Sequence, residues 1–118
     1  MTVSDGPQDG PPAEGQGGEG QGGEGLGGPV LTRTLKICNR RGLHARAAAK
    51  FVTLAEQYGA SVDVVRDGQS VSARSIMGLM MLGAGIGSSI ELRAEGWDAR
   101  EALDALAGLV EAGFNEQD

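Results

Sequence analysis

Hydrophobic and polar residues follow regular patterns along the chain from about residue 30 onward. Leu31, Leu35 and Ile37 are separated by polar residues, an alternation typical of a strand with one buried face. From residue 45 to residue 58 the apolar residues recur at helical spacing, and Gly59 is placed to end that helix. The pattern therefore predicts a strand followed by an amphipathic helix.

The same criteria predict three more strands and two more helices. Asp67-Gly68 is a strong hairpin signal between the second and third strands. Asp98 and Glu101 have the spacing of a capping box for the last helix, and Gly113 is placed to end it. The second strand is predicted over 61–66, and a short third strand runs from the Asp67-Gly68 turn through residue 71. A short apolar helix is predicted over 75–82 and a fourth strand over 88–94.

The order β-α-β-β-α-β-α predicts the fold class. Strands that are apolar on one face only, together with amphipathic helices, indicate two layers. We expect an α+β domain in which helices cover one side of an antiparallel sheet.

Composition separates a short N-terminal segment from this domain. Residues 1–29 contain no Lys, Arg or aromatic residue, and the pentapeptide QGGEG occurs at 16–20 and again at 21–25. Such a segment buries too little apolar surface to offset the entropy of ordering glycine. We expect a disordered, glycine-rich acidic tail over 1–29, which is best interpreted as a passive extension, and a folded domain over 30–118.

Charge is distributed unevenly. The net charge is −6, yet residues 1–29 hold five acidic residues and no basic ones, which leaves 11 acidic against 10 basic residues in the domain. Four of these basic residues surround the one histidine, and no aromatic residue is interleaved with them: Arg40, Arg41, Arg46 and Lys50. A nucleic-acid surface would usually combine a basic stripe with stacking aromatics. The pattern therefore favours binding of a small anion over binding of nucleic acid.

Several features predict the compartment. The single cysteine, Cys38, cannot form a disulfide within the chain, and the N-terminus lacks the basic start and apolar stretch of an export signal. The longest apolar stretch, 76–86, is too short to cross a bilayer. We expect a cytoplasmic protein without membrane insertion.

The candidate chemistry lies at His44. This residue stands where the first strand has ended and the first helix begins, so unpaired backbone N–H groups and the positive end of the helix dipole are close by. Neutral imidazole can act as a nucleophile toward phosphorus, and the Arg46 guanidinium matches phosphoryl oxygens. Gly42 permits the tight turn before it, and the alanines at 45, 47, 48 and 49 predict a flat surface around it.

Other interpretations of His44 are a solvated residue at a helix start, a metal ligand or a hydrolase base. A metal site lacks a second histidine, and Cys38 lies on a strand six residues away. A serine hydrolase triad would need a nucleophile-elbow motif, which the chain does not have. The residues therefore favour neither a metal site nor a hydrolase site.

Two motifs decide between the alternatives. The segment GLHARAAA, residues 42–49, resembles the active-site signature of the HPr family, the histidine-containing phosphocarriers of the phosphoenolpyruvate:sugar phosphotransferase system. The segment RSIMG, residues 74–78, resembles the second signature of that family, around its regulatory serine, at the family's spacing. The resemblance covers about residues 31–113. It implies an open-faced sandwich with a four-stranded sheet and three helices on one face.

The resemblance also implies roles and partners. Enzyme I, phosphorylated by phosphoenolpyruvate, would transfer phosphate to Nδ1 of His44, and a IIA-type protein would accept it. Arg46 would position and stabilise the phosphoryl group. The resemblance implies that the chain binds no metal or other cofactor itself. The chain would then be a carrier shared by two partners, rather than a stand-alone enzyme, and we expect a monomer.

Ser75 corresponds to the regulatory serine, which implies phosphorylation by HPr kinase/phosphorylase, although a helix-capping role is also open. We expect partners to dock on residues around both phosphorylation sites, with Leu79 and Leu82 in the core. The candidate docking residues are Ala45, Ala47, Lys50, Ile76, Met77 and Met80.

One residue departs from the family pattern. Most members have proline directly after the arginine, where this chain has Ala47. We expect altered stability of the phosphohistidine rather than loss of phosphorylation, and the departure favours a branch with mainly regulatory duties over sugar uptake. Two other interpretations stay open: a regulatory domain of this fold that carries no phosphate, and a separated domain of a multidomain phosphotransferase protein.

Overall fold

The computed structural model describes residues 29–116. The tail predicted over residues 1–29 lies outside this range except for Pro29, and residues 117–118 also lie outside it. The described elements follow the predicted order, with one short 3-10 helix, η1, added after the last α-helix. They are β1 (Leu31–Lys36), α1 (Ala45–Ala55), β2 (Ser61–Arg66), β3 (Gln69–Ser72), α2 (Ile76–Met81), β4 (Ser89–Glu95), α3 (Ala99–Glu111) and η1 (Gly113–Asn115).

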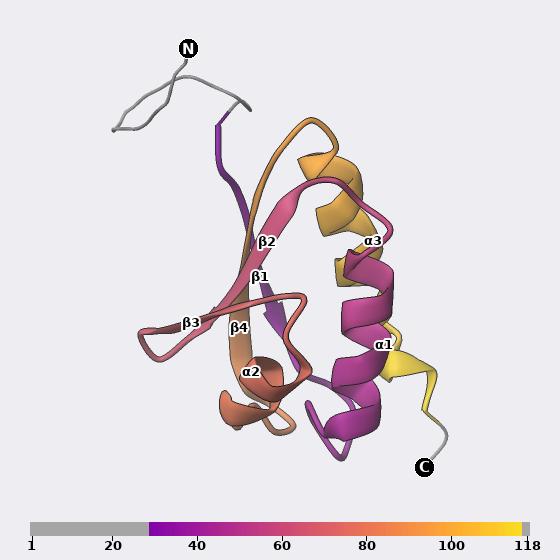
Figure 1. Ribbon diagram of the computed structural model, residues 1–118. Coiled ribbons are helices and arrows are strands. Elements are labelled where there is room, and N and C mark those ends of the chain that lie inside the picture. Colours follow the sequence, from indigo (N-terminus) through magenta and orange to yellow (C-terminus); the bar gives the residue numbers. More distant parts are fainter. Residues whose placement is uncertain (1–28, 117–118) are drawn as a thin grey trace.

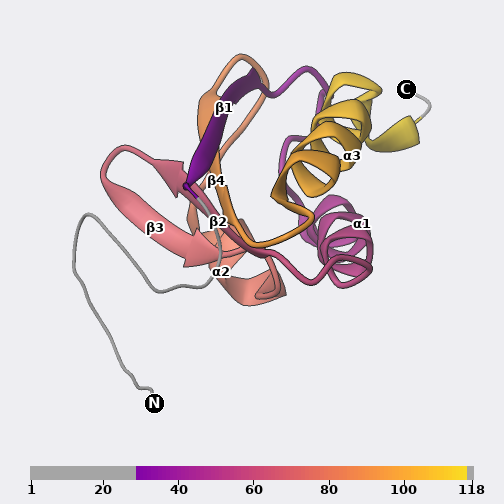
Figure 2. The same ribbon diagram turned by 90° about the horizontal axis from the view of Figure 1, so that it is seen from above.

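The strands form one four-stranded antiparallel sheet in the order β1-β4-β2-β3. Leu35 of β1 pairs with Ile90 of β4, and Leu92 of β4 pairs with Val64 of β2. These four side chains are buried, as the alternation along each strand predicts. The helices lie on one face of the sheet (Figures 1 and 2), which confirms the predicted α+β open-faced sandwich.

Helix α1 buries the apolar face that its spacing predicts, including the fully buried Phe51. The helix ends at Ala55, however, so the prediction that it extends to residue 58 and is closed by Gly59 is wrong. Hydrogen bonds three residues apart tighten the chain beyond Ala55, from Gln57 N–H to the Leu54 carbonyl and from Tyr58 N–H to the Ala55 carbonyl.

The hydrogen bonds of Asp98 explain both the early end of α1 and the absence of the predicted capping box at the start of α3. The carboxylate of Asp98 accepts hydrogen bonds from the backbone N–H groups of Gly59 (2.9 Å) and Ala60 (2.8 Å), and the side chain is buried. Asp98 therefore joins the α1–β2 connection to the start of α3. It precedes α3 as predicted, but it makes no capping hydrogen bond there, so the predicted capping box with Glu101 is wrong.

Beyond α3 the chain turns back toward the start of α1. Gly113 ends α3 with φ +65°, as predicted, and Phe114 and Asn115 each have φ +58°. Phe114 is fully buried. This segment, Gly113–Glu116, which we call the C-terminal hook, lies beside α1 (yellow in Figure 1) and brings Glu116 to His44.

None of the helices within residues 29–116 has both the length and the apolar character needed to span a lipid bilayer.

Candidate functional site

A tight turn before α1 sets the position of His44. Gly42 has φ +66°, a conformation that disfavours other residues, and a Cβ atom built there would lie 2.4 Å from the Ala84 carbonyl oxygen. The Leu43 N–H donates to the same oxygen (2.9 Å), and the Asn39 side-chain amide donates to the Gly42 carbonyl (2.9 Å). The turn is therefore packed against the α2–β4 connection and held from the β1 side.

His44 is the residue immediately before the first turn of α1. Its backbone is extended, and its carbonyl accepts the N–H of Ala48 (2.9 Å), which is the first hydrogen bond of the helix. The side chain of His44 itself makes no capping hydrogen bond with the backbone at this helix end. The N–H groups of the first turn, residues 45–47, are thus placed to bind an anion beside the imidazole.

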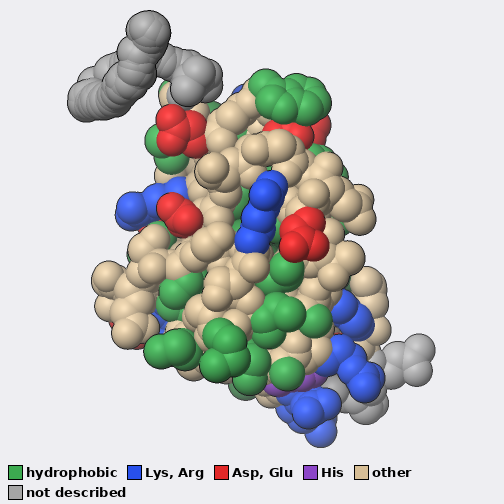
Figure 3. Space-filling view, viewed as in Figure 1, with side chains coloured by type: hydrophobic (Ala, Val, Ile, Leu, Met, Phe, Trp, Pro, Cys, Tyr) green, Lys and Arg blue, Asp and Glu red, His purple; other side chains and the backbone are tan. Residues whose placement is uncertain are grey.

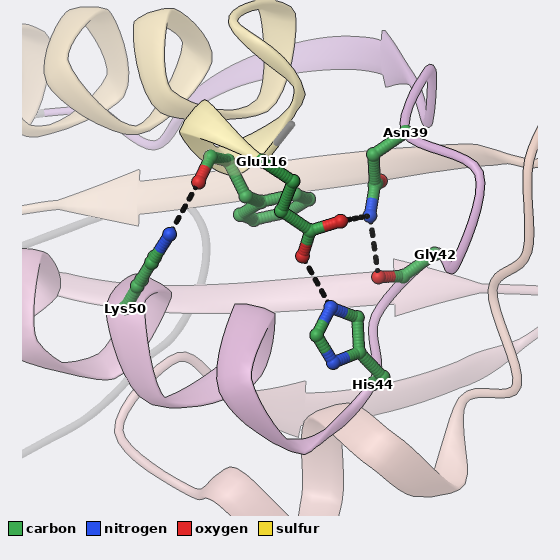
Figure 4. A network of polar contacts seen from close by, with 6 residues as sticks. Asn39, Gly42, His44, Lys50 and Glu116 are labelled. Atoms are coloured by element: carbon green, nitrogen blue, oxygen red, sulfur yellow. Dashed lines mark hydrogen bonds and ion pairs between the residues drawn. The ribbon is translucent and has the colours of Figure 1, made fainter. Parts of the chain in front are cut away.

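The imidazole of His44 contacts a carboxylate that was not predicted from the sequence. Its Nε2 atom forms a hydrogen bond with Oε2 of Glu116, and the two side chains are only 16% and 11% exposed. Figure 4 shows the other ring nitrogen, Nδ1, facing away from Glu116. Within residues 29–116, the hydrogen bond of the ring is made by Nε2 and not by Nδ1.

Glu116 is held from two directions. Its Oε1 atom accepts a hydrogen bond from the Asn39 side-chain amide (3.1 Å), while Oε2 meets His44 (Figure 4). The hydrogen bonds from His44 and Asn39 lower the pKa of Glu116, and the nearby charge of Arg41 lowers it further. At neutral pH the ring thus faces a charged carboxylate.

The predicted basic residues have different surroundings. Arg40, Arg41 and Arg46 are exposed, and none of them forms an ion pair or side-chain hydrogen bond within residues 29–116. Lys50 is half-buried, and its ammonium group donates to the Phe114 carbonyl (2.6 Å), so it secures the C-terminal hook. Figure 3 shows basic side chains gathered on one side of the single histidine and apolar side chains on the other.

The apolar side of the histidine includes the α2 region. Ile76, Met77 and Met80 are exposed as predicted. Met81 and Ile86, which are not among the predicted docking residues, are exposed as well. Leu79 and Leu82 are buried, as predicted.

Ser75 caps helix α2, as one of the two interpretations of this serine predicts. Its hydroxyl accepts a hydrogen bond from the Gly78 N–H (2.9 Å), and the residue is half-buried.

Ala47 is the docking candidate that the structure contradicts. It is fully buried, as is Ala48, because both face the core side of α1. The prediction that the run of alanines forms a flat surface holds only for Ala45, which is exposed, and in part for Ala49. Ala47 therefore shapes the packing beneath the first turn rather than a partner surface.

Glu116 and Asn39 were missed because neither belongs to a motif. The available signal was Phe114, a lone aromatic residue in a polar terminus directly after a helix-ending glycine. An aromatic residue at such a position indicates that the terminus packs back onto the domain.

Comparisons with known proteins show which proteins the chain is similar to. A family model described as "PTS HPr component phosphorylation site" matches residues 31–112. The phosphocarrier protein HPr of Cupriavidus necator is 48% identical over 74% of this chain and 98% of its own length. The phosphocarrier protein NPr of Shewanella violacea is 46% identical over 73% of this chain and 94% of its own length.

A solved structure is similar as well. The crystal structure of HPr-C-His from Thermoanaerobacter tengcongensis superimposes with a TM-score of 0.71 and is 43% identical, over 75% of this chain and 99% of that one. The similarity in sequence and in fold therefore covers about three quarters of the chain, including residues 31–112.

Proposed function

Because the chain belongs to the HPr family of phosphocarrier proteins, we propose that it carries a phosphoryl group on Nδ1 of His44. The donor is phosphorylated Enzyme I, the acceptor is a IIA-type protein, and the exchange takes place in the cytoplasm. The observation that carries the proposal is the orientation of the ring: Nε2 is occupied by Glu116, whereas Nδ1 faces away from it at the start of α1.

The site supplies what the transfer requires. The lone pair of Nδ1 attacks phosphorus, the donor P–N bond breaks, and its electrons return to the donor nitrogen. Backbone N–H groups at residues 45–47 offer hydrogen bonds to the phosphoryl oxygens, and Arg46, in the same turn, adds a positive charge. Partners meet the ring across Ala45, Lys50, Ile76, Met77 and Met80, on a monomer.

The decisive experiment is phosphorylation in solution. Incubation with phosphoenolpyruvate and Enzyme I is expected to attach about one phosphate per chain that is labile in acid and stable in alkali, as phosphohistidine is. A reaction without Enzyme I is the control. If no such phosphate appears, the chain is a regulatory domain of this fold that carries none.

Ser75 is proposed as a second, regulatory phosphorylation site, modified by HPr kinase/phosphorylase. Its hydroxyl already serves as a helix cap, and phosphate oxygens can accept the same Gly78 N–H. The modification adds about two negative charges next to the exposed Ile76 and Met77. We infer that it inhibits docking of Enzyme I without unfolding α2.

A Ser75→Asp variant tests this inhibition. Like-charge and desolvation costs at the docking face are expected to lower kcat/KM for phosphate transfer from Enzyme I by about tenfold or more. Ser75→Ala is the matched control: it should keep the wild-type rate and lose about 1 kcal/mol of stability with the cap. A Ser75→Asp protein that accepts phosphate at the wild-type rate would contradict the inhibition.

A further inference from the structure

The C-terminal hook ends in a carboxylate that fits the ring of His44 on the side opposite the reacting atom. Both oxygens of Glu116 are engaged, Oε1 by the Asn39 amide at 3.1 Å and Oε2 by Nε2 of His44. A solvated glutamate would not be expected to lie 11% exposed with both oxygens paired inside its own domain. The arrangement indicates a defined role for this side chain.

The hook itself is firmly held. Phe114 is fully buried, its carbonyl accepts a hydrogen bond from Lys50 at 2.6 Å, and Phe114 and Asn115 share a left-handed backbone conformation. Two consecutive residues in that conformation cost free energy, so the packing of Phe114 must offset the cost. Glu116 is thereby fixed in position before any partner arrives.

A charged carboxylate only accepts hydrogen bonds, so Nε2 must carry the ring proton. The lone pair of neutral His44 is then on Nδ1. When Nδ1 bonds to phosphorus while Nε2 keeps its proton, the ring gains positive charge, and Glu116 lies beside that charge.

We propose that Glu116 is a positioning residue for phosphoryl transfer: it holds His44 in the tautomer with a free Nδ1 and balances the positive charge of the phosphorylated ring. This rests on the proposed function of His44. Glu116 acts through the imidazole and does not contact the phosphoryl group.

The first test measures the tautomer of the His44 ring, and this measurement does not require phosphorylation of the chain. Long-range proton–nitrogen NMR spectra of the full chain at pH 8 should show wild-type His44 with a proton on Nε2 and a bare Nδ1. Glu116→Ala should move both nitrogen shifts toward an average of the two tautomers. Identical ring shifts in the two proteins would overturn the proposal.

Transfer kinetics provide the second test. With phosphorylated Enzyme I as donor, Glu116→Gln should lower kcat about tenfold, the size expected for one charge-assisted hydrogen bond, with KM nearly unchanged. Glu116→Asp, which keeps the charge on a shorter side chain, should recover part of the rate. Glu111→Gln is the matched control, because Glu111 is exposed five residues earlier, and it should behave as wild type.

The outcomes separate the two proposals. If wild type acquires no phosphohistidine, the proposed function fails, whereas the NMR test of Glu116 still stands. If wild type is phosphorylated and Glu116→Gln matches or exceeds its rate, Glu116 does not assist the ring. A thermal melt of each variant shows whether the hook is still packed.

Discussion

Replacing His44 with alanine is expected to abolish acid-labile phosphorylation by phosphoenolpyruvate and Enzyme I completely. The chain contains one histidine, so no other imidazole can accept the group. The site offers no alternative nucleophile in the same place, because the first turn of α1 contributes alanines and Arg46. Mass spectrometry of the intact chain, before and after acid treatment, measures the loss.

The interpretation of that variant depends on its folding. His44 lies at the helix start, but its side chain is only 16% exposed, so its removal should cost the domain part of the packing around the ring as well as the contact with Glu116. Backbone amide NMR spectra of His44→Ala should match wild type away from α1 and the C-terminal hook. If the folded variant still gains one acid-labile phosphate, His44 is not the acceptor.

The sequence was sufficient to predict the arrangement of the elements, because the evidence for them is local. Alternation placed Leu35 and Ile90 on the covered face of the sheet, and the pairing of these two residues follows once both strands face the same core. The Asp67-Gly68 turn joins β2 and β3 as predicted, with positive φ at both residues.

The predictions of the capping box and of the end of α1 failed because one side chain could form hydrogen bonds with more than one set of partners. Asp98 has the right spacing from Glu101 to cap α3, and the same carboxylate can accept the N–H groups of Gly59 and Ala60. Those two amides lie 38 and 39 residues away in sequence, so no local pattern shows that they are nearby. The folded chain forms the contact between Asp98 and these two amides instead of the local cap, and α1 ends before Gly59.

The same reasoning explains which half of the site could be predicted. The helix start and its histidine are encoded within residues 42–49, and a local motif is sufficient to find them. Glu116 reaches His44 from 72 residues away, through a turn of two left-handed residues that no local pattern predicts. The place of His44 at the helix start was therefore predictable, and the carboxylate that contacts its ring was not.

Gly42 forms the tight turn that positions His44 against the α2–β4 connection. Gly42→Ala is the substitution with the second largest expected effect. Two costs combine there. A side chain at φ +66° is strained, by about 1–2 kcal/mol, and its Cβ would lie 2.4 Å from the Ala84 carbonyl oxygen. Overpacking of this kind costs typically about 1–3 kcal/mol. We expect a total loss of about 3 kcal/mol in the free energy of unfolding, measured by chemical denaturation.

Gly83→Ala separates the two costs. Gly83 has φ +64°, almost the same backbone conformation, but a Cβ atom there meets nothing within 4 Å. This variant should lose only the strain energy, about 1–2 kcal/mol, and keep the wild-type rate of phosphate acceptance. Gly42→Ala should lose more stability and also transfer phosphate more slowly, because relieving the collision displaces the turn that carries His44. Equal losses of stability in the two variants would show that the approach of Gly42 to Ala84 does not hold the site in place.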